Sequence, residues 1–223
     1  TGKSGSLDEA VASNRLISSR WVKRAFDLAF GSLMLLAFLP LGLMISIVIF
    51  LADRGAPIYA HKRVGRGGRE FYCLKFRTMV PNADALLDDL LLRSPEAVEE
   101  WEQYRKLRND PRIVPVVGAF LRKTSLDELP QIVNVIRGDM SIVGPRPVIW
   151  DEVRMYGPAA PLYLSVRPGL TGPWQAGVRS DATFEYRVSQ DVQYIENWSL
   201  WADVRLIVKT AAMFLRGKTQ GAY

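Results

Sequence analysis

The sequence has a single cysteine and a single histidine in 223 residues, which excludes several kinds of site. With Cys73 alone, the chain can form neither an internal disulfide nor a thiolate metal cluster, and it gives no sign of an oxidising compartment. A Ser-His-Asp triad could be built only around His61, and a histidine-rich metal site cannot be built. The motif Asp-x-Asp, the usual metal motif of nucleotide-sugar glycosyltransferases, does not occur. Carboxylates, lysines and arginines are therefore the candidate functional groups.

Familiar phosphate-binding loops are also missing. The glycine-rich segment Gly65-Arg66-Gly67-Gly68 is not closed by Lys-Ser or Lys-Thr, as a Walker loop requires, and it does not match a dinucleotide fingerprint. Glycines between two runs of strand-forming residues are instead typical of a hairpin turn. The sequence predicts a β-hairpin with strands at residues 57–61 and 70–79.

The longest uncharged run, residues 28–52, has the length of a membrane helix. As one helix it would extend about 37 Å, at roughly 1.5 Å per residue, which exceeds a hydrocarbon layer of about 30 Å. Fifteen of its residues are Leu, Ile, Phe or Val, each favouring insertion by roughly 0.3 to 0.6 kcal/mol near the bilayer centre. Together they outweigh a proline kink of about 3 kcal/mol. We therefore expect this run to enter the bilayer.

Basic residues flank both ends of the run, and Pro40 lies at its midpoint. By the positive-inside rule, both ends then lie in the cytoplasm. A chain that enters and leaves by one face must turn within the bilayer, and Pro40 can break the helix there. The sequence predicts a re-entrant helix-break-helix hairpin, with a spanning helix that tolerates the proline as the alternative. The flanking residues are Arg15, Arg20, Lys23 and Arg24 before the run, and Arg54, Lys62, Arg63, Arg66 and Arg69 after it.

Charge and length suggest one catalytic domain on one anchor. The formal net charge is +6 and the pI is about 9.5, which favours an anionic partner. Nucleic acid is not expected, because the basic residues lie beside the apolar run and in short turn motifs rather than in a nucleic-acid-binding pattern. Membrane lipids and a phosphate-bearing substrate account for the same charges. The predicted division is an N-terminal tail at 1–22, the membrane hairpin at 23–53 and a cytoplasmic domain at 54–223.

The fold class expected for the whole chain is α+β and mainly helical. Residues 82–108 fit two helices, because Ser94-Pro95-Glu96 has the pattern of a new helix start. A further helix is expected at 125–136 and ends before Gly138, and residues 141–143 are expected to be extended. Loops are expected over 157–181 and helices over 184–198 and 200–215. The last helix is amphipathic, and both a membrane-interface position and packing on the domain core remain open.

The segment 122–131 concentrates charged residues of both signs. Asp127 and Glu128 follow Arg122 and Lys123 at the expected start of a helix, where the helix dipole favours negative charge. This arrangement could provide a carboxylate nucleophile in Asp127 and a metal ligand in Glu128. The alternative is structural, because Ser125-x-x-Glu128 matches a capping box.

Two further segments present fixed cations. In Gly144-Pro145-Arg146-Pro147 the prolines restrict the backbone around Arg146, which lowers the entropy lost when its guanidinium binds an anion. Lys75 and Arg77 alternate with Phe76 on a predicted strand, so both cations should share one face that could contact a diphosphate. A solvated arginine and a solvated strand face are the structural alternatives.

These residues together resemble the monotopic polyprenyl-phosphate hexose-1-phosphate transferases, a family of bacterial sugar transferases. Among members, the chain is most similar to the short form without an N-terminal membrane domain that initiates succinoglycan with galactose-1-phosphate. The matching segments run from Lys23-Arg24-Ala25-Phe26-Asp27 through Leu74-Lys75-Phe76-Arg77-Thr78-Met79, Asp127-Glu128-Leu129-Pro130-Gln131, Asn134, Arg137-Gly138-Asp139-Met140-Ser141, Gly144-Pro145-Arg146-Pro147 and Arg167-Pro168-Gly169-Leu170-Thr171-Gly172 to Asn197-Trp198-Ser199-Leu200.

The resemblance implies a two-step exchange. Asp127 would attack the β-phosphate of a UDP-hexose, expel UMP and hold the sugar phosphate until polyprenyl phosphate takes it. Glu128 would bind Mg²⁺, while Lys75, Arg122 and Arg146 would neutralise phosphates. Asp191 would be a supporting carboxylate. One departure is Leu39-Pro40, since family members often have Ser-Pro at the break in the membrane helix, and a serine back-bond is therefore missing here.

Several expectations follow from the resemblance. The hexose is expected to be galactose, with glucose as the alternative, in the initiation of exopolysaccharide synthesis at the cytoplasmic face of a bacterial inner membrane. The oligomeric state is open, with a homodimer as one option. Two rival hypotheses are a one-step transferase without a covalent intermediate and a non-enzymatic membrane scaffold in which the acid pair only caps a helix.

Overall fold

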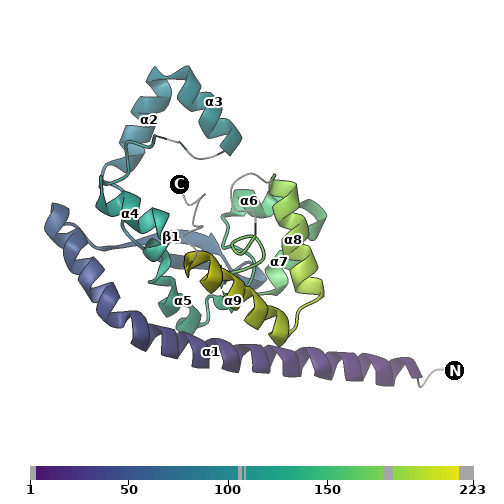
Figure 1. Ribbon diagram of the computed structural model, residues 1–223. Helices are drawn as coiled ribbons and strands as arrows, with labels where there is room; N and C mark the ends of the chain where they lie inside the picture. The colour runs from purple at the N-terminus through teal and green to yellow at the C-terminus, as the bar shows by residue number, and fades with distance from the viewer. Residues whose placement is uncertain (1–3, 105–106, 108, 178–182, 216–223) are drawn as a thin grey trace.

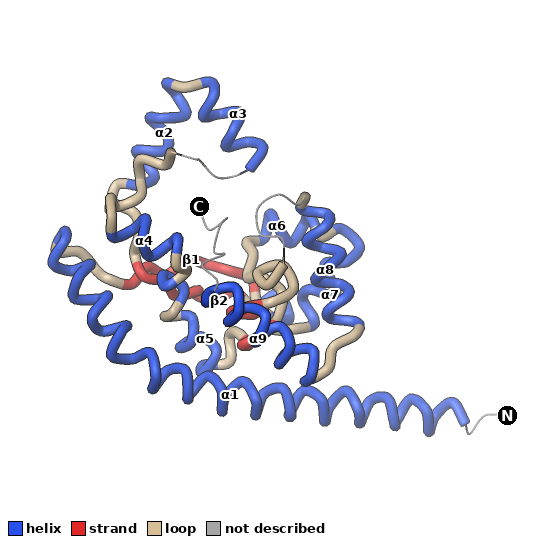
Figure 2. Tube along the Cα trace, in the orientation of Figure 1, coloured by secondary structure: helices blue, strands red, loops and turns tan. Residues whose placement is uncertain are grey.

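The computed structural model describes residues 4–104, 107, 109–177 and 183–215. Two small sheets lie in the middle of a domain that is otherwise helical, and a long N-terminal helix runs along one side of it (Figure 2). The α+β, mainly helical class predicted from the sequence is therefore confirmed.

The N-terminal helix α1 (Ser4–Asp53) is continuous through Pro40. Residues 4–22, predicted as a tail, form its first part, and the predicted break into two helices is not present. In Figure 1, however, the later, blue part of α1 turns away from the line of the purple part. A proline removes one backbone bond and crowds the preceding turn, which bends a helix, while the turns on either side keep their own bonds. The helix therefore bends and does not break.

Helix α1 contacts the domain on both sides of Pro40. Before it, Phe30 and Met34 pack against one hydrophobic cluster, and after it Ile45 and Ile49 are buried in another. The outward face of this part of the helix stays exposed and apolar. Its large exposed side chains, here called the exposed face of α1, are Leu33, Leu36, Phe38, Leu39, Leu43, Met44, Ile47, Val48, Phe50 and Leu51.

An exposed apolar surface of this size is typical of a membrane contact. By length and composition alone, Arg20–Ala52 could cross a membrane. The structure thus supports membrane association through α1.

The predicted β-hairpin is confirmed. Strands β1 (Ile58–Val64) and β2 (Glu70–Phe76) pair antiparallel, and the turn contains the short 3₁₀ helix η1 (Arg66–Gly68). Gly67 and Gly68 have φ of 72° and 75°, a conformation that favours glycine. Phe71 and Cys73 alternate inward along β2, which places Lys75 on the same side of the strand.

Two helices follow, as predicted, and stand away from the rest of the domain (Figure 2). They are α2 (Ala83–Arg93) and α3 (Pro95–Tyr104), and Ser94 starts the second by accepting a hydrogen bond from the Ala97 N–H. The predicted end at residue 108 lies outside the described residues. The sequence did not indicate the next helix, α4 (Val117–Lys123), which is only seven residues long.

The helix predicted at 125–136 is divided in two. The 3₁₀ helix η2 (Leu126–Glu128) comes first, and α5 (Gln131–Arg137) follows after Pro130. Because proline has no N–H to continue the ladder, the chain cannot run through this point as one regular helix. Helix α5 ends at Gly138, whose φ of 91° confirms the predicted end.

The remaining elements surround a small parallel sheet of β3 (Ser141–Val143) and β4 (Gly169–Thr171). The prediction of loops over 157–181 is wrong in part, because this region contains helix α7 and strand β4, which are too short to show a periodic pattern. Residues 178–181 of that prediction lie outside the described residues. The helices are α6 (Trp150–Met155), η3 (Gly157–Ala159), α7 (Ala160–Ser165), α8 (Phe184–Glu196) and α9 (Leu200–Leu215), and the last two confirm predictions.

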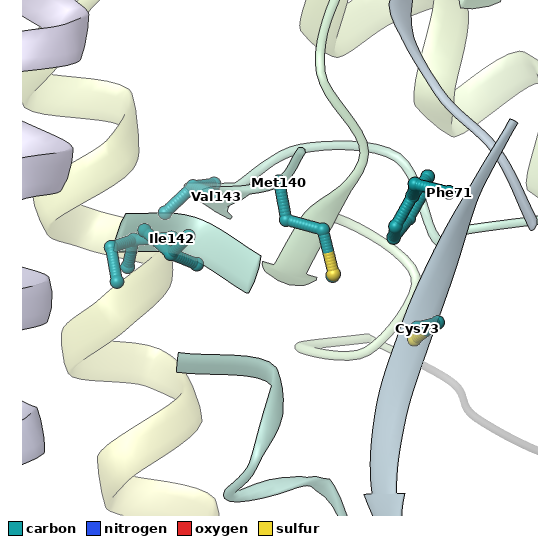
Figure 3. Close-up of a cluster of buried hydrophobic side chains, with 6 residues drawn as sticks. Phe71, Cys73, Met140, Ile142 and Val143 are labelled. Carbon is teal, nitrogen blue, oxygen red and sulfur yellow. The ribbon is translucent and has the colours of Figure 1, made fainter. Parts of the chain in front are cut away.

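The central hydrophobic cluster joins the hairpin to β3. Phe71 and Cys73 of β2 lie on one side of Met140, and Ile142 and Val143 lie on the other (Figure 3). Side chains of α1 and of α9 pack against the same cluster. The membrane helix, the hairpin and β3 thus share one core, and the candidate site lies on elements that this core fixes.

Candidate active site

The acid pair lies in a 3₁₀ turn and not in a capped helix. Ser125, which would cap the helix in the structural alternative, has a left-handed φ of 54° and its side chain makes no cap hydrogen bond. The capping-box interpretation is therefore wrong. Asp127 is buried, with 8% of its surface exposed, and Glu128 is partly buried beside it. Burying adjacent carboxylates is costly unless cations accompany them.

Lys75 supplies a positive charge to both acids. Its Nζ lies 2.8 Å from Oε1 of Glu128 and 3.7 Å from Oδ2 of Asp127, so one ammonium group serves both carboxylates. Asn134 of α5 fixes this arrangement. Its side chain accepts a hydrogen bond from the Leu74 N–H at 2.9 Å and donates one to the Tyr72 carbonyl at 2.8 Å, which ties β2 to the helix that follows the acids.

Arg146 also contacts the acid pair, through Glu128. Its Nη1 lies 3.7 Å from Oε1 of Glu128, and about 40% of its side chain remains exposed. The guanidinium therefore has free surface with which to bind a further anion beside the acid pair.

Arg122 is the third cation of the site. It lies in the last turn of α4, and burial lowers the pKa of its guanidinium, while Asp127 and Asp110 raise it. The structure thus brings Lys75, Arg122 and Arg146 together around the acid pair.

The ionisation of Asp127 depends on this setting. Burial raises the pKa of Asp127 above its usual range, Glu128 raises it further, and Lys75, Arg122 and Arg146 act in the opposite direction. A nucleophilic carboxylate must be ionised, so the three cations favour the reactive form against the effect of burial.

Close backbone packing holds the loop that carries Arg146. Gly144 accepts no larger residue, because an added Cβ would lie 2.6 Å from the Arg167 carbonyl. Added Cβ atoms at Gly169 and Gly172 would collide with the backbone of Gly144 in turn. The Gly144 N–H donates to the Thr171 carbonyl at 2.9 Å, and the Gly169 N–H donates to the Pro145 carbonyl at 2.7 Å. The sequence Arg167-Pro168-Gly169-Leu170-Thr171-Gly172 is thus the support of the arginine loop.

Arg77 lies near the end of α1. It follows the end of β2, and its guanidinium packs against Gly55, just after α1. The backbone pairing continues one residue past β2, since the Arg77 N–H donates to the Pro57 carbonyl at 2.9 Å, and a shared face of Lys75 and Arg77 stays a prediction.

Asp191 also lies apart from the acid pair. It is fully buried on α8, where its Oδ2 accepts a hydrogen bond from the Tyr156 hydroxyl at 2.7 Å. Burial raises the pKa of Asp191 to about 6, although Tyr156 and Arg187 act to lower it. Its contacts join α8 to α6.

A charged network that the sequence does not indicate includes Arg63, Glu152 and Arg187. Arg63 of β1 lies 3.4 Å from Glu152, which also lies 3.7 Å from Arg187. Nη2 of Arg63 lies 3.0 Å from Nδ1 of His61. Arg63 and His61 are two apart on β1, so strand alternation could have placed both on one face, but their carboxylate partner lies on a helix far away in sequence.

The donor set is compatible with the expected Mg²⁺. In the part of the chain that the structure describes, no group of three or more His, Cys, Asp or Glu side chains could hold a metal by itself. Magnesium usually binds through one or two carboxylates and completes its coordination with water and substrate phosphates. Two adjacent carboxylates, Asp127 and Glu128, meet this requirement when a phosphate-bearing substrate is present.

Comparison with known proteins agrees with the sequence resemblance. Residues 18–217 match the family described as bacterial sugar transferase. The exopolysaccharide production protein ExoY of Rhizobium meliloti strain 1021 is 52% identical over 84% of this chain and 83% of that protein. The UDP-galactose-lipid carrier transferase of Erwinia amylovora is 50% identical, and the undecaprenyl-phosphate galactose phosphotransferase of Salmonella typhimurium strain LT2 is 47% identical. Each of these two matches covers 92% of this chain and 42% of the relative.

The shared segment includes the acid pair, its three cations and the loops that support them, since all of these lie within the matched residues. The two longer relatives have more than half of their length outside the match, while ExoY is covered over most of its length. The chain therefore belongs to the bacterial sugar transferase family.

Proposed function

We propose that this protein transfers galactose-1-phosphate from UDP-galactose to undecaprenyl phosphate, releases UMP and so initiates exopolysaccharide synthesis. The observation that carries the proposal is the buried Asp127 with Glu128 beside it and Lys75, Arg122 and Arg146 around them. The names of three similar proteins refer to exopolysaccharide production, to a UDP-galactose-lipid carrier and to undecaprenyl phosphate.

In the proposed mechanism, Asp127 is the nucleophile. One carboxylate oxygen forms a bond to the β-phosphorus of the UDP-sugar, and the bond from that phosphorus to the oxygen bridging it to the α-phosphorus breaks, so that UMP leaves. The phosphate of the lipid then attacks the same phosphorus and displaces Asp127. In a direct reaction, the lipid phosphate and the diphosphate of the UDP-sugar would repel each other. With a covalent intermediate, the two anions react in separate steps.

The cations have distinct positions for this chemistry. Lys75 contacts both acids, so it favours the ionised form of Asp127 before the attack. Arg146 has exposed surface next to Glu128 and is placed to bind the diphosphate. Glu128 would hold Mg²⁺, which supplies neutralisation of the phosphate charge when bound.

The membrane position of the site completes the proposal. Helix α1 contacts the domain both before and after Pro40, so a straight crossing of the bilayer would pull part of the domain into the lipid. A bent helix that enters the inner membrane by its exposed face and returns to the cytoplasmic side avoids this cost. The chain then meets the soluble UDP-sugar and the lipid phosphate at the same surface.

A panel of UDP-sugars tests the proposal. The protein in vesicles with Mg²⁺ and undecaprenyl phosphate should release UMP fastest from UDP-galactose, and Asp127→Asn should abolish the release even without lipid. Fastest release from UDP-glucose would show that the transferred hexose is glucose, while the proposed reaction would stay the same. No UMP from any UDP-sugar would contradict the proposal and favour the scaffold hypothesis.

A further inference from the structure

The start of the apolar part of α1 is fastened to the domain by a buried ionic cluster. Nζ of Lys23 lies 2.8 Å from Asp203 of α9 and 3.1 Å from Asp27 of α1 itself. Both aspartates are fully buried, and 15% of the lysine side chain is exposed. One lysine thus joins α1 to α9 inside the domain.

Asp27 contacts β3 directly, and Asp203 is connected to it through Tyr194. Asp27 accepts hydrogen bonds from the Ser141 hydroxyl at 3.0 Å and from the Ile142 N–H at 3.1 Å. Asp203 accepts one from the Tyr194 hydroxyl at 2.7 Å, and Tyr194 also contacts the Val143 carbonyl at 3.1 Å. Strand β3 leads directly into the loop that carries Arg146, so this cluster lies behind the arginine loop.

Arg24 makes a second attachment, to the helix after the acid pair. Its two terminal nitrogens donate to the carbonyls of Val135 and Ile136 at 2.7 and 2.8 Å. These carbonyls belong to the last turn of α5, where the Val135 carbonyl also accepts a hydrogen bond from the Gly138 N–H at 3.1 Å. Lys23, through Asp27, and Arg24 therefore hold the strand that precedes the arginine loop and the helix that follows the acid pair.

This use of Lys23 and Arg24 differs from a general preference for positive charge near a membrane. A charge that only sets orientation remains in solvent or among lipid headgroups, whereas these two are bound to specific acceptors of the domain. The contacts fix α1 relative to the acid pair and Arg146 before α1 reaches its exposed apolar residues. The height of the site above the lipid surface then follows from these contacts.

We propose that Lys23, Arg24 and Asp203 are positioning residues for the lipid step. They hold the membrane helix at the height at which the phosphate of the lipid reaches Asp127. The inference rests on the proposed function, and it predicts that the two half-reactions respond differently when an attachment is removed. The soluble UDP-sugar reaches the site from water. Only the reaction with the lipid acceptor therefore depends on the height of the site above the lipid surface.

The test uses the full-length protein in vesicles. Arg24→Gln and Lys23→Met are compared for the UMP burst without acceptor and for product formation at increasing mole fractions of undecaprenyl phosphate. Both variants should raise the half-saturating mole fraction by about tenfold, as a small misplacement of reacting groups can, and should leave the burst unchanged. Lys23→Arg should keep wild-type behaviour.

Matched controls are Arg205→Gln and Lys209→Met, which change exposed basic residues of α9. Both should retain wild-type dependence on the acceptor. If Lys23→Met does not fold because it leaves two buried aspartates unpaired, Arg24→Gln decides, since it removes no partner of a carboxylate. An unchanged acceptor dependence, or a burst that falls in step with turnover, would overturn the positioning role. Absence of UMP release in the wild type would instead contradict the proposed function.

Discussion

At the scale of single residues, nearby cations compensate the charge of the buried acid in the site. Asp127 is buried, so its reactive form depends on the cations around it, and the segment 122–131 already contained both acids and Arg122. Sequence spacing could not decide between a nucleophile and a helix cap, because both use the same residues. The left-handed conformation of Ser125 rules out the helix cap. The sequence could not predict this conformation, because a serine residue does not indicate a left-handed backbone.

Replacing Arg146 tests its role in phosphate binding. Arg146→Ala should lower the rate of UMP release by on the order of 10², as the loss of a transition-state donor does. The control is Arg154→Ala on α6, which removes an arginine whose side chain is 79% exposed and pairs with nearby Asp151. Equal turnover of the two variants in a UMP-release assay would show that Arg146 does not take part in the reaction.

Asp191 gives a prediction for stability against pH. Its pKa is about 6 in the folded protein because of burial, above the value of 3.8 for an unperturbed side chain. The folded state therefore binds the proton more tightly, so this contribution to stability is present at low pH and is lost as the pH rises through about 6. This shift of the pKa from 3.8 to about 6 corresponds to a contribution to the free energy of unfolding on the order of 3 kcal/mol.

Thermal unfolding of Asp191→Asn measures this effect. The amide keeps an acceptor for Tyr156 but cannot ionise, so the variant should gain Tm relative to the wild type as the pH rises from about 4 to about 7. Parallel Tm curves would show that Asp191 does not change its proton binding on folding. The rate of UMP release by the same variant, measured at low pH, decides whether Asp191 contributes to catalysis.

At the scale of elements, those with strong local signals were predicted, and so was the short strand β3, but several short helices were not. The hairpin, the end of α5 at Gly138 and the helices α8 and α9 have turn glycines or periodic apolar residues that reveal them. Helices α4, α6 and α7 have seven residues or fewer, which is too short for a pattern. Strand β4 pairs with a strand distant in sequence, and such a pairing depends on the tertiary fold.

The glycine contacts behind the arginine loop predict a sensitive position. Gly172→Ala should push the loop of Arg146 away from its support, which should lower stability by about 1–3 kcal/mol and reduce UMP release. The matched control is Gly42→Ala in α1, where the new Cβ would make only an ordinary contact, 3.8 Å from Phe76. Denaturant unfolding and UMP release should separate the two variants, and similar values for both would contradict the proposed support.

At the scale of the whole molecule, the sequence indicated the membrane helix but not its shape. The apolar run and its basic flanks predicted entry into the bilayer, and the exposed face of α1 agrees with this. The break at Pro40 is replaced by a bend, because one missing bond does not end a helix whose neighbouring turns are intact. Binding of Lys23 and Arg24 to the domain could not be predicted, since their partners are more than 100 residues away.

Thiol labelling in sealed vesicles tests the re-entrant orientation. Cys73 is buried, so a cysteine introduced at an exposed position is the accessible thiol. Trp21→Cys before the apolar run and Glu196→Cys in the domain should both react with an impermeant reagent in inside-out membrane vesicles, and neither should react in right-side-out vesicles. Reaction of one position in each preparation would establish a spanning helix.

The covalent intermediate on Asp127 is the central claim, and intact mass spectrometry tests it most directly. Protein incubated with Mg²⁺ and UDP-galactose, without lipid acceptor, should gain the mass of one hexose phosphoryl group, which peptide mapping should place on Asp127. Addition of undecaprenyl phosphate should remove the added mass and form the lipid product. Formation of lipid product by a protein that never carries this mass, or by Asp127→Asn, would contradict the account.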